Sequence, residues 1–162
     1  MSTESVPTTL FEHLTEFFAE LGWDAVPVPG EPILGVTVRT ASGAENTLVA
    51  STDEVARVIS FFARPPFAVP EKLRRDIVHL LNDVNFQLND GTWMVDPADG
   101  ELRFRTGLQC GSTLPSGEQI RRTAGYALVG IEAHLPVLED WIAGNIDRDD
   151  ALERMVGTQR SS

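Results

Sequence analysis

The stretch NDGTWMVDPADGELRFRT, residues 89–106, decides the fold of this chain. Trp93 and Val95 share one face of an extended run, and after the dipeptide Asp99-Gly100 Leu102 and Phe104 share a face while Arg103 and Arg105 point the other way. Alternation on both sides of an Asp-Gly dipeptide predicts a β-hairpin, because glycine accepts the positive φ of a tight turn. The polar side chains of the stretch are then expected to cap the hairpin rather than to form a site: Asn89, Asp90, Asp96, Asp99 and Glu101.

A metal loop and a carboxylate active site are the alternatives for this stretch. An EF-hand calcium loop needs alternating oxygen ligands and a glycine at its sixth position. Counted from Asp96, the third position is Ala98 and the glycine comes one residue early; counted from Asp147, the fifth position is Ala151. Carboxylates at a hairpin tip stay solvated and ionised, which leaves them without catalytic character. The sequence therefore predicts no bound metal and no cofactor.

Other catalytic signatures are also missing from the sequence. It contains no HExxH motif, no glycine-rich phosphate loop and no GxSxG turn. His79 is expected on the polar side of a helix, and His13 and His134 at the margins of apolar helix faces. Cys110 follows a strand, where a packing role is favoured over a nucleophilic one. We expect no catalytic residue and a protein that is not an enzyme.

The charge balance narrows the classes of partner. The chain has 13 Lys and Arg against 24 Asp and Glu, a net charge of −11. Nucleic acids and anionic membranes attract clustered Lys and Arg, so neither is an expected partner. A single cysteine excludes an internal disulfide and fits a reducing compartment. The N-terminus lacks the basic start and apolar run of a signal peptide, so we expect a soluble cytoplasmic protein.

The whole chain predicts helices and strands in the order α-β-β-β-α-β-β-α. Thr9 and Glu12 form a capping-box pattern before a strongly apolar helix that Gly22 ends. Pro136 is expected to kink or divide the last long helix. Helices are expected at about 9–21, 70–87, 117–143 and, as a short terminal element, 147–156; strands are expected at 33–39, 45–51 and 55–62 before the hairpin.

This order defines the fold class as α+β, with an antiparallel sheet packed by helices. We expect one domain over residues 8–156, between flexible termini at 1–7 and 157–162. The strand predicted at 55–62 is apolar on both faces, since Val58 and Phe62 share one face while Ile59 and Phe61 share the other. A sheet with one wetted face does not show this pattern, so a second subunit or a partner is expected to cover it.

Aromatic and arginine side chains are the candidates for partner contact, because aromatics supply much of the interface energy where they are exposed. The predicted partner-binding residues are Phe17, Phe18, Phe61, Phe62, Trp93, Arg103 and Arg105. The alternative function is a domain that binds a small ligand, or catalyses a reaction without a cofactor, in a pocket between the last long helix and the sheet. Polar groups such as His134, Arg105 and Asn85 would have to converge there.

Four segments resemble the YbjN-like family, whose fold is that of the type III secretion chaperones. The resemblance covers about residues 8–144. It is carried by FFAELGW (17–23), VPEKLRRDIVHLLNDVNF (69–86), DGTWMVDPADGELRFRTGL (90–108) with its Gly-Trp-Asp-Gly-Glu pattern, and YALVGIEAHLPVLEDWIAG (126–144).

The resemblance implies a small acidic cytoplasmic protein, commonly a homodimer, that works by binding another polypeptide. Secretion chaperones of this fold hold an extended segment of their cargo along apolar grooves formed by helix and sheet. The family has no catalytic residues to transfer to this chain. We therefore expect a chaperone-like or regulatory protein-binding module that acts as a homodimer.

Overall fold

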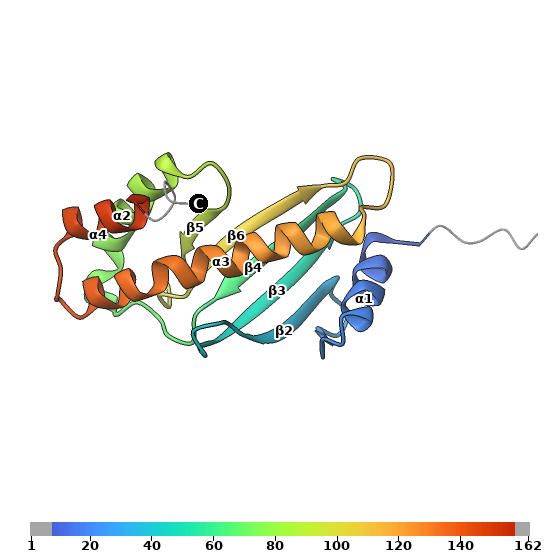
Figure 1. Ribbon diagram of the computed structural model, residues 1–162, viewed down its shortest axis with the longest axis horizontal. Helices are drawn as coiled ribbons and strands as arrows, with labels where there is room; N and C mark the ends of the chain where they lie inside the picture. Colours follow the sequence, from blue (N-terminus) through green and yellow to red (C-terminus); the bar gives the residue numbers. More distant parts are fainter. Residues whose placement is uncertain (1–7, 158–162) are drawn as a thin grey trace, which may run out of the picture.

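A computed structural model describes residues 8–157 and confirms the predicted α+β domain, in which helices pack on a six-stranded antiparallel sheet (Figure 1). The predictions for residues 1–7 and 158–162 lie outside the described residues, and Gly157 belongs to the last helix. The elements are α1 (Leu10–Glu20), β1 (Val26–Pro27), β2 (Ile33–Arg39), β3 (Glu45–Asp53), β4 (Val58–Arg64), the 3-10 turn η1 (Glu71–Leu73), α2 (Arg74–Gln87), β5 (Thr92–Val95), β6 (Leu102–Gln109), α3 (Gly117–Ile142) and α4 (Arg148–Gly157).

The sheet has the strand order β1-β2-β3-β4-β6-β5. The hairpin of the opening stretch therefore enters the sheet through β6, which pairs with β4 on one side and with β5 on the other. In the register of these strands, Val49 lies opposite Phe62 and Phe62 lies opposite Arg105. Successive side chains of a strand point to opposite faces, so this register also decides which residues share a face.

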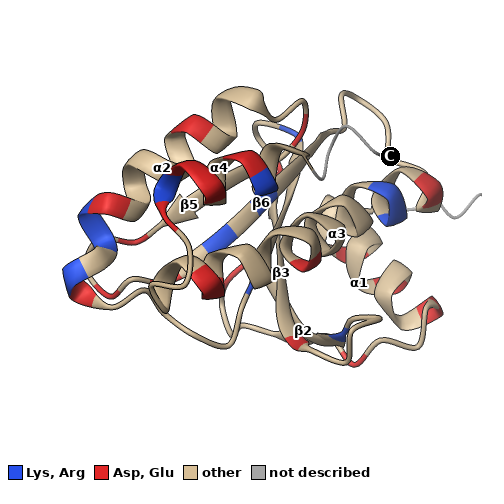
Figure 2. Cartoon of the chain, turned by 60° about the vertical axis from the view of Figure 1, so that its left-hand side comes forward, with Lys and Arg blue, Asp and Glu red and all other residues tan. Residues whose placement is uncertain are grey.

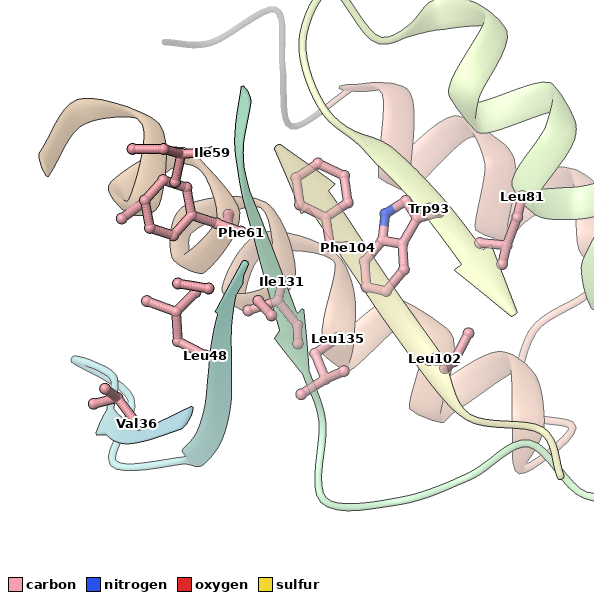
Figure 3. Close-up of a cluster of buried hydrophobic side chains, with 14 of the residues drawn as sticks. Val36, Leu48, Ile59, Phe61, Leu81, Trp93, Leu102, Phe104, Ile131 and Leu135 are labelled. Carbon is pink, nitrogen blue, oxygen red and sulfur yellow. The ribbon is translucent and has the colours of Figure 1, made fainter. Parts of the chain in front are cut away.

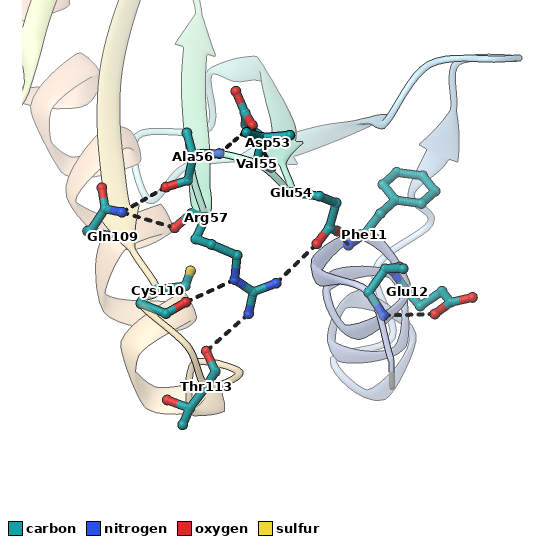
Figure 4. Close-up of polar contacts among 12 residues, drawn as sticks. Phe11, Glu12, Asp53, Glu54, Val55, Ala56, Arg57, Gln109, Cys110 and Thr113 are labelled. Atoms are coloured by element: carbon teal, nitrogen blue, oxygen red, sulfur yellow. Dashed lines mark hydrogen bonds and ion pairs between the residues drawn. The ribbon is translucent and has the colours of Figure 1, made fainter. Parts of the chain in front are cut away.

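The third predicted strand begins later than expected, because residues 54–57 form a turn (Figure 4). The Asp53 carboxylate accepts hydrogen bonds from the backbone N–H groups of Val55 and Ala56, and Arg57 adopts a left-handed φ of 56°. The Arg57 side chain then donates to the carbonyl of Gly111 and pairs with Glu54. An aspartate that captures nearby backbone donors favours a turn over a strand.

The core lies between the sheet and the helices α1, α2 and α3 (Figure 1), and Figure 3 shows part of it. Ile59 and Phe61 from β4 are fully buried there together with Ile131 from α3. The capping boxes at Thr9 and Ser116 fix the starts of α1 and α3. Pro136 does not divide α3, which runs without interruption from residue 117 to residue 142.

The C-terminal helix α4 exists as expected and packs against α2 and α3. Its residues Ala151 and Met155 are fully buried. An ion pair between Arg148 and Asp83 ties its start to α2, and a second between Arg154 and Asp140 ties it to α3. These pairs are exposed, so the buried side chains supply most of the stability of this contact.

Gly130 on α3 faces the ring of Phe104 on β6. A Cβ atom at this position would lie 2.2 Å from the Cε1 atom of Phe104. We expect Gly130→Ala to lower the free energy of unfolding by about 1–3 kcal/mol through overpacking. Gly125 lies in the same helix, and a Cβ there would meet nothing within 4 Å.

Gly125→Ala is therefore the matched control and should raise the stability by up to about 1 kcal/mol, the ordinary gain in a helix interior. Urea titration monitored by circular dichroism measures both changes. Equal effects of the two substitutions would show that Phe104 yields to the added methyl group.

Candidate functional site

The hairpin tip is built as the sequence predicted. Gly100 has a φ of 81°, and its N–H bonds to the carbonyl of Asp96 at 2.8 Å. The carboxylates of Asp96 and Asp99 accept the backbone N–H groups of Ala98 and Glu101, each at 2.8 Å. These side chains stabilise the turn, and among the described residues no three His, Cys, Asp or Glu side chains gather closely enough to hold a metal ion.

Four of the predicted partner-binding residues lie in the core. Phe61 and Phe18 are 0% and 1% exposed, and Phe17 and Trp93 are buried as well. Each faces the helix side of the sheet or the underside of its own helix, because the apolar stripe of α1 and the inner residues of β4 and β5 meet there. Their side chains are buried in the core and unavailable to a partner in this conformation.

The other three predicted residues lie together on the opposite face of the sheet, which we call the open face. This face comprises the side chains of β2–β6 that point away from α1 and α3. One row of Cα partners crosses all five strands at its centre: Gly35, Val49, Phe62, Arg105 and Thr92. Phe62 and Val49 are half-buried and Arg105 is exposed.

Arg105 lies over Phe62 on this face. Its Cζ atom is 5.8 Å from the centroid of the Phe62 ring, and its Nη2 donates to the Ser60 hydroxyl at 3.2 Å. A guanidinium group carries five N–H donors, so most of its donors remain available to another molecule. Among residues 8–157, Arg105 makes no ion pair with a carboxylate.

Two further arginines flank this position and share one carboxylate. The Nη1 atom of Arg64 is 3.1 Å from one oxygen of Glu101, and Arg103 contacts the other oxygen of the same carboxylate. A hollow of about 380 Å³ adjoins Arg64 and Glu101 and is lined also by Thr47 and Phe67. The open face thus combines guanidinium groups with half-buried apolar side chains and a recess.

Over the rest of the molecule, acidic side chains outnumber basic ones. Acidic positions are spread over the helices, including α2 and α4 (Figure 2). The chain carries a net charge of −11, so a cluster of three arginines around Phe62 departs from the average of its surface. Local excess charge of this kind selects partners of complementary charge.

A second apolar surface lies at the edge of the sheet. The short strand β1 pairs with β2 at Leu34 and Gly35. Next to it is a groove of about 870 Å³, lined by apolar side chains that include Trp23, Val26 and Val38. Val26 is 67% exposed. None of the predicted partner-binding residues lines this groove.

The residues of the alternative small-ligand pocket do not converge. Arg105 lies on the open face, whereas His134 and Asn85 lie on the helix side of the sheet and both bond to Trp93. Asn85 exchanges two hydrogen bonds with the Trp93 backbone, at 2.7 and 2.9 Å. Core side chains fill the layer between α3 and the sheet.

His134 is a structural residue in a closed hydrogen-bond chain. It is 1% exposed. The indole N–H of Trp93 donates to its Nδ1 at 2.8 Å, and its Nε2 lies 2.9 Å from the Met155 carbonyl oxygen. Because the indole can only donate, Nδ1 is the acceptor and Nε2 carries the proton that bonds to Met155. Burial lowers the pKa of His134, although the bond to Met155 acts in the opposite direction.

The other titratable candidates of the sequence have structural surroundings. The Nε2 of His13 bonds to the carbonyl of Pro115 at 2.7 Å, and His79 is exposed on α2. Burial raises the pKa of the Cys110 thiol, although Arg57 nearby acts in the opposite direction. A raised pKa leaves less of the reactive thiolate, which agrees with a packing role.

Sequence reasoning missed the residues that support Phe62 and Arg105. Val49 and Ser60 come from β3 and β4 and join Arg105 only through the strand register. Val49 was not singled out in the sequence, and the pairing of β4 with β6 has no signal in either strand alone.

Comparison with known proteins identifies the fold. No family model and no curated protein matches this chain. One solved structure is similar, the crystal structure of YbjN, described as "a putative transcription regulator from E. coli", with a TM-score of 0.56 and 14% sequence identity over 80% of this chain and 94% of YbjN. The chain therefore has a YbjN-like fold. No helix among the described residues has the length and apolar character to cross a membrane.

Proposed function

We propose that this chain is a non-enzymatic protein-binding module with a regulatory or chaperone-like role, acting as a homodimer. The observation that carries the proposal is the open face, where Phe62 and Val49 lie beside Arg105 and no helix of residues 8–157 covers them. Exposed aromatic and arginine side chains are the residue types that dominate protein interfaces. The description of YbjN as a regulator supports the regulatory part of the proposal.

The position of the polar groups favours binding over catalysis. His134 and Asn85, the polar residues considered for a pocket, are engaged with Trp93 in the interior. Arg105 is on the other side of the sheet, so the three groups cannot act on one substrate. A catalytic site needs such groups within hydrogen-bond reach of one reacting atom.

Phe62→Asp tests the proposal. We expect this variant to lose its bound polypeptide or its dimer, because a carboxylate replaces the central apolar side chain of the open face. The fold should remain, with a cost of about 1 kcal/mol for the lost burial of a half-buried ring. Native mass spectrometry of the full chain, purified gently from its own host, measures the mass of the particle.

Two matched variants locate the surface. Val55→Asp makes the same kind of change at a turn position that is 96% exposed, and it should leave the particle unchanged. Val26→Asp places a carboxylate in the groove beside β1. If Val26→Asp loses the partner and Phe62→Asp keeps it, the binding site is the groove beside β1. If the wild type is a monomer without a bound polypeptide, the proposal is contradicted.

A further inference from the structure

We propose that the open face binds an acidic polypeptide segment, in which aspartate or glutamate side chains stand beside apolar ones. This inference rests on the proposed protein-binding function and adds the chemistry of the partner. The carboxylates would meet the guanidinium group of Arg105, and the apolar side chains would cover Phe62 and Val49. The structure points to this partner through the arrangement of charge on the face.

The arrangement of the arginines supplies the first argument. Arg64 and Arg103 are both engaged by Glu101, whose two oxygens they occupy. Arg105 has no such carboxylate among the described residues. Its hydrogen bond to Ser60 and its contact with the Phe62 ring hold the guanidinium group in place without neutralising its charge. A planar guanidinium group recognises a carboxylate with two parallel hydrogen bonds. We therefore expect the partner to place a carboxylate group against Arg105.

The apolar part of the face supplies the second argument. Phe62 and Val49 are direct neighbours across β3 and β4, and Met94 on β5 is 40% exposed. The hollow beside Arg64, lined by Thr47 and Phe67, continues this surface at one end. A purely polar acidic segment would leave these apolar side chains exposed to water. A segment with both acidic and apolar residues would bury them and also place a carboxylate beside Arg105.

The charge of the whole chain limits the kind of anion. A nucleic acid or an anionic membrane extends over many charges, and it would run from the open face onto the acidic helices of a chain at −11. Repulsion there would oppose the attraction at Arg105. A short acidic segment avoids this repulsion, because its charge stays within about one Debye length, roughly 8–10 Å, of the arginine cluster.

A selection experiment on the full chain tests the inference. A random twelve-residue peptide library displayed on phage is selected on the wild type and depleted on Phe62→Asp. We expect the enriched peptides to combine an excess of Asp and Glu with apolar residues. A fluorescent copy of the most enriched peptide should bind Arg105→Glu about tenfold or more weakly by anisotropy, because a charged hydrogen-bond pair is replaced by two like charges.

Two further variants control the charge change. Arg105→Gln keeps a hydrogen-bond donor without the charge and should weaken binding less than Arg105→Glu, which also covers the case that Arg105→Glu fails to fold. Arg122→Glu makes the same change on α3, where the side chain is exposed beside Tyr126, and should bind like the wild type.

The failure of the inference differs from the failure of the proposed function. Enriched peptides without an acidic excess, or equal binding by wild type and Arg105→Glu, would overturn the acidic partner and leave a protein-binding face. If no peptide is enriched while Phe62→Asp converts a dimer to a monomer, a second copy covers the face and the acidic partner is overturned. No enrichment and no change of mass would remove both proposals.

Discussion

Phe61→Asp is expected to unfold the protein. Phe61 is 0% exposed and points from β4 toward the helices, between Ala50 on β3 and Thr106 on β6. Removing a buried phenylalanine side chain costs about 3–5 kcal/mol, and a carboxylate left in the core adds a desolvation penalty or must be protonated. Most domains have only about 5–15 kcal/mol of stability in total, so the variant should show no cooperative unfolding transition by circular dichroism.

The adjacent residue provides the control for this experiment. Phe62→Asp changes the same side chain one position later, on the open face, where the new carboxylate lies beside Arg105. We expect a helical spectrum and a cooperative transition for Phe62→Asp. A folded Phe61→Asp protein that loses only its partner would instead place Phe61 at an interface and contradict the face assignment of β4.

The protein is expected to lose stability in mild acid through His134. Burial holds the pKa of this side chain below the ordinary value of 6.5. The unfolded chain therefore binds more protons between the lowered pKa and 6.5, so stability rises with pH in that window and falls as the pH is lowered through it. Protonation also places an N–H on Nδ1 against the indole N–H of Trp93, which breaks the hydrogen bond between them.

Comparison with His134→Gln isolates this effect from the carboxylates that titrate at lower pH. The glutamine amide can accept from Trp93 and donate to the Met155 carbonyl, and it does not titrate. Urea unfolding at about pH 7.5 and about pH 5, on either side of the ordinary histidine pKa, measures both proteins. The wild type should lose more free energy of unfolding than His134→Gln, and equal losses would show that His134 binds its proton as readily in the folded protein as in the unfolded chain.

The local elements could be predicted from the sequence because their signals are local. The Asp-Gly dipeptide and the alternation around it predicted the hairpin, and the capping box at Thr9 predicted the start of α1. The strand β2 occupies the predicted residues 33–39. Each of these signals depends on neighbours within a few positions, which is the range over which a single sequence is informative.

The composition of the open face could not be predicted, because it depends on pairing between distant strands. The sequence shows that β4 is apolar on both faces but not which face the helices cover, so it gives no reason to separate Phe61 from Phe62. The sequence of α4 shows no strong apolar stripe, so its packing position could not be predicted. In the fold, the Met155 carbonyl of α4 accepts the second hydrogen bond of the His134 ring. Both features required the tertiary arrangement.

The pairing of β4 with β6 also has a consequence for the order of folding. The strands β1–β4 follow one another along the chain and can form a meander early, and β5 and β6 can form their hairpin separately. Joining the two parts closes a loop over residues 65–101, which makes it the slower, entropically costly step. Phe62 and Arg105 lie on either side of this join, so they become neighbours on the open face only when the two parts meet.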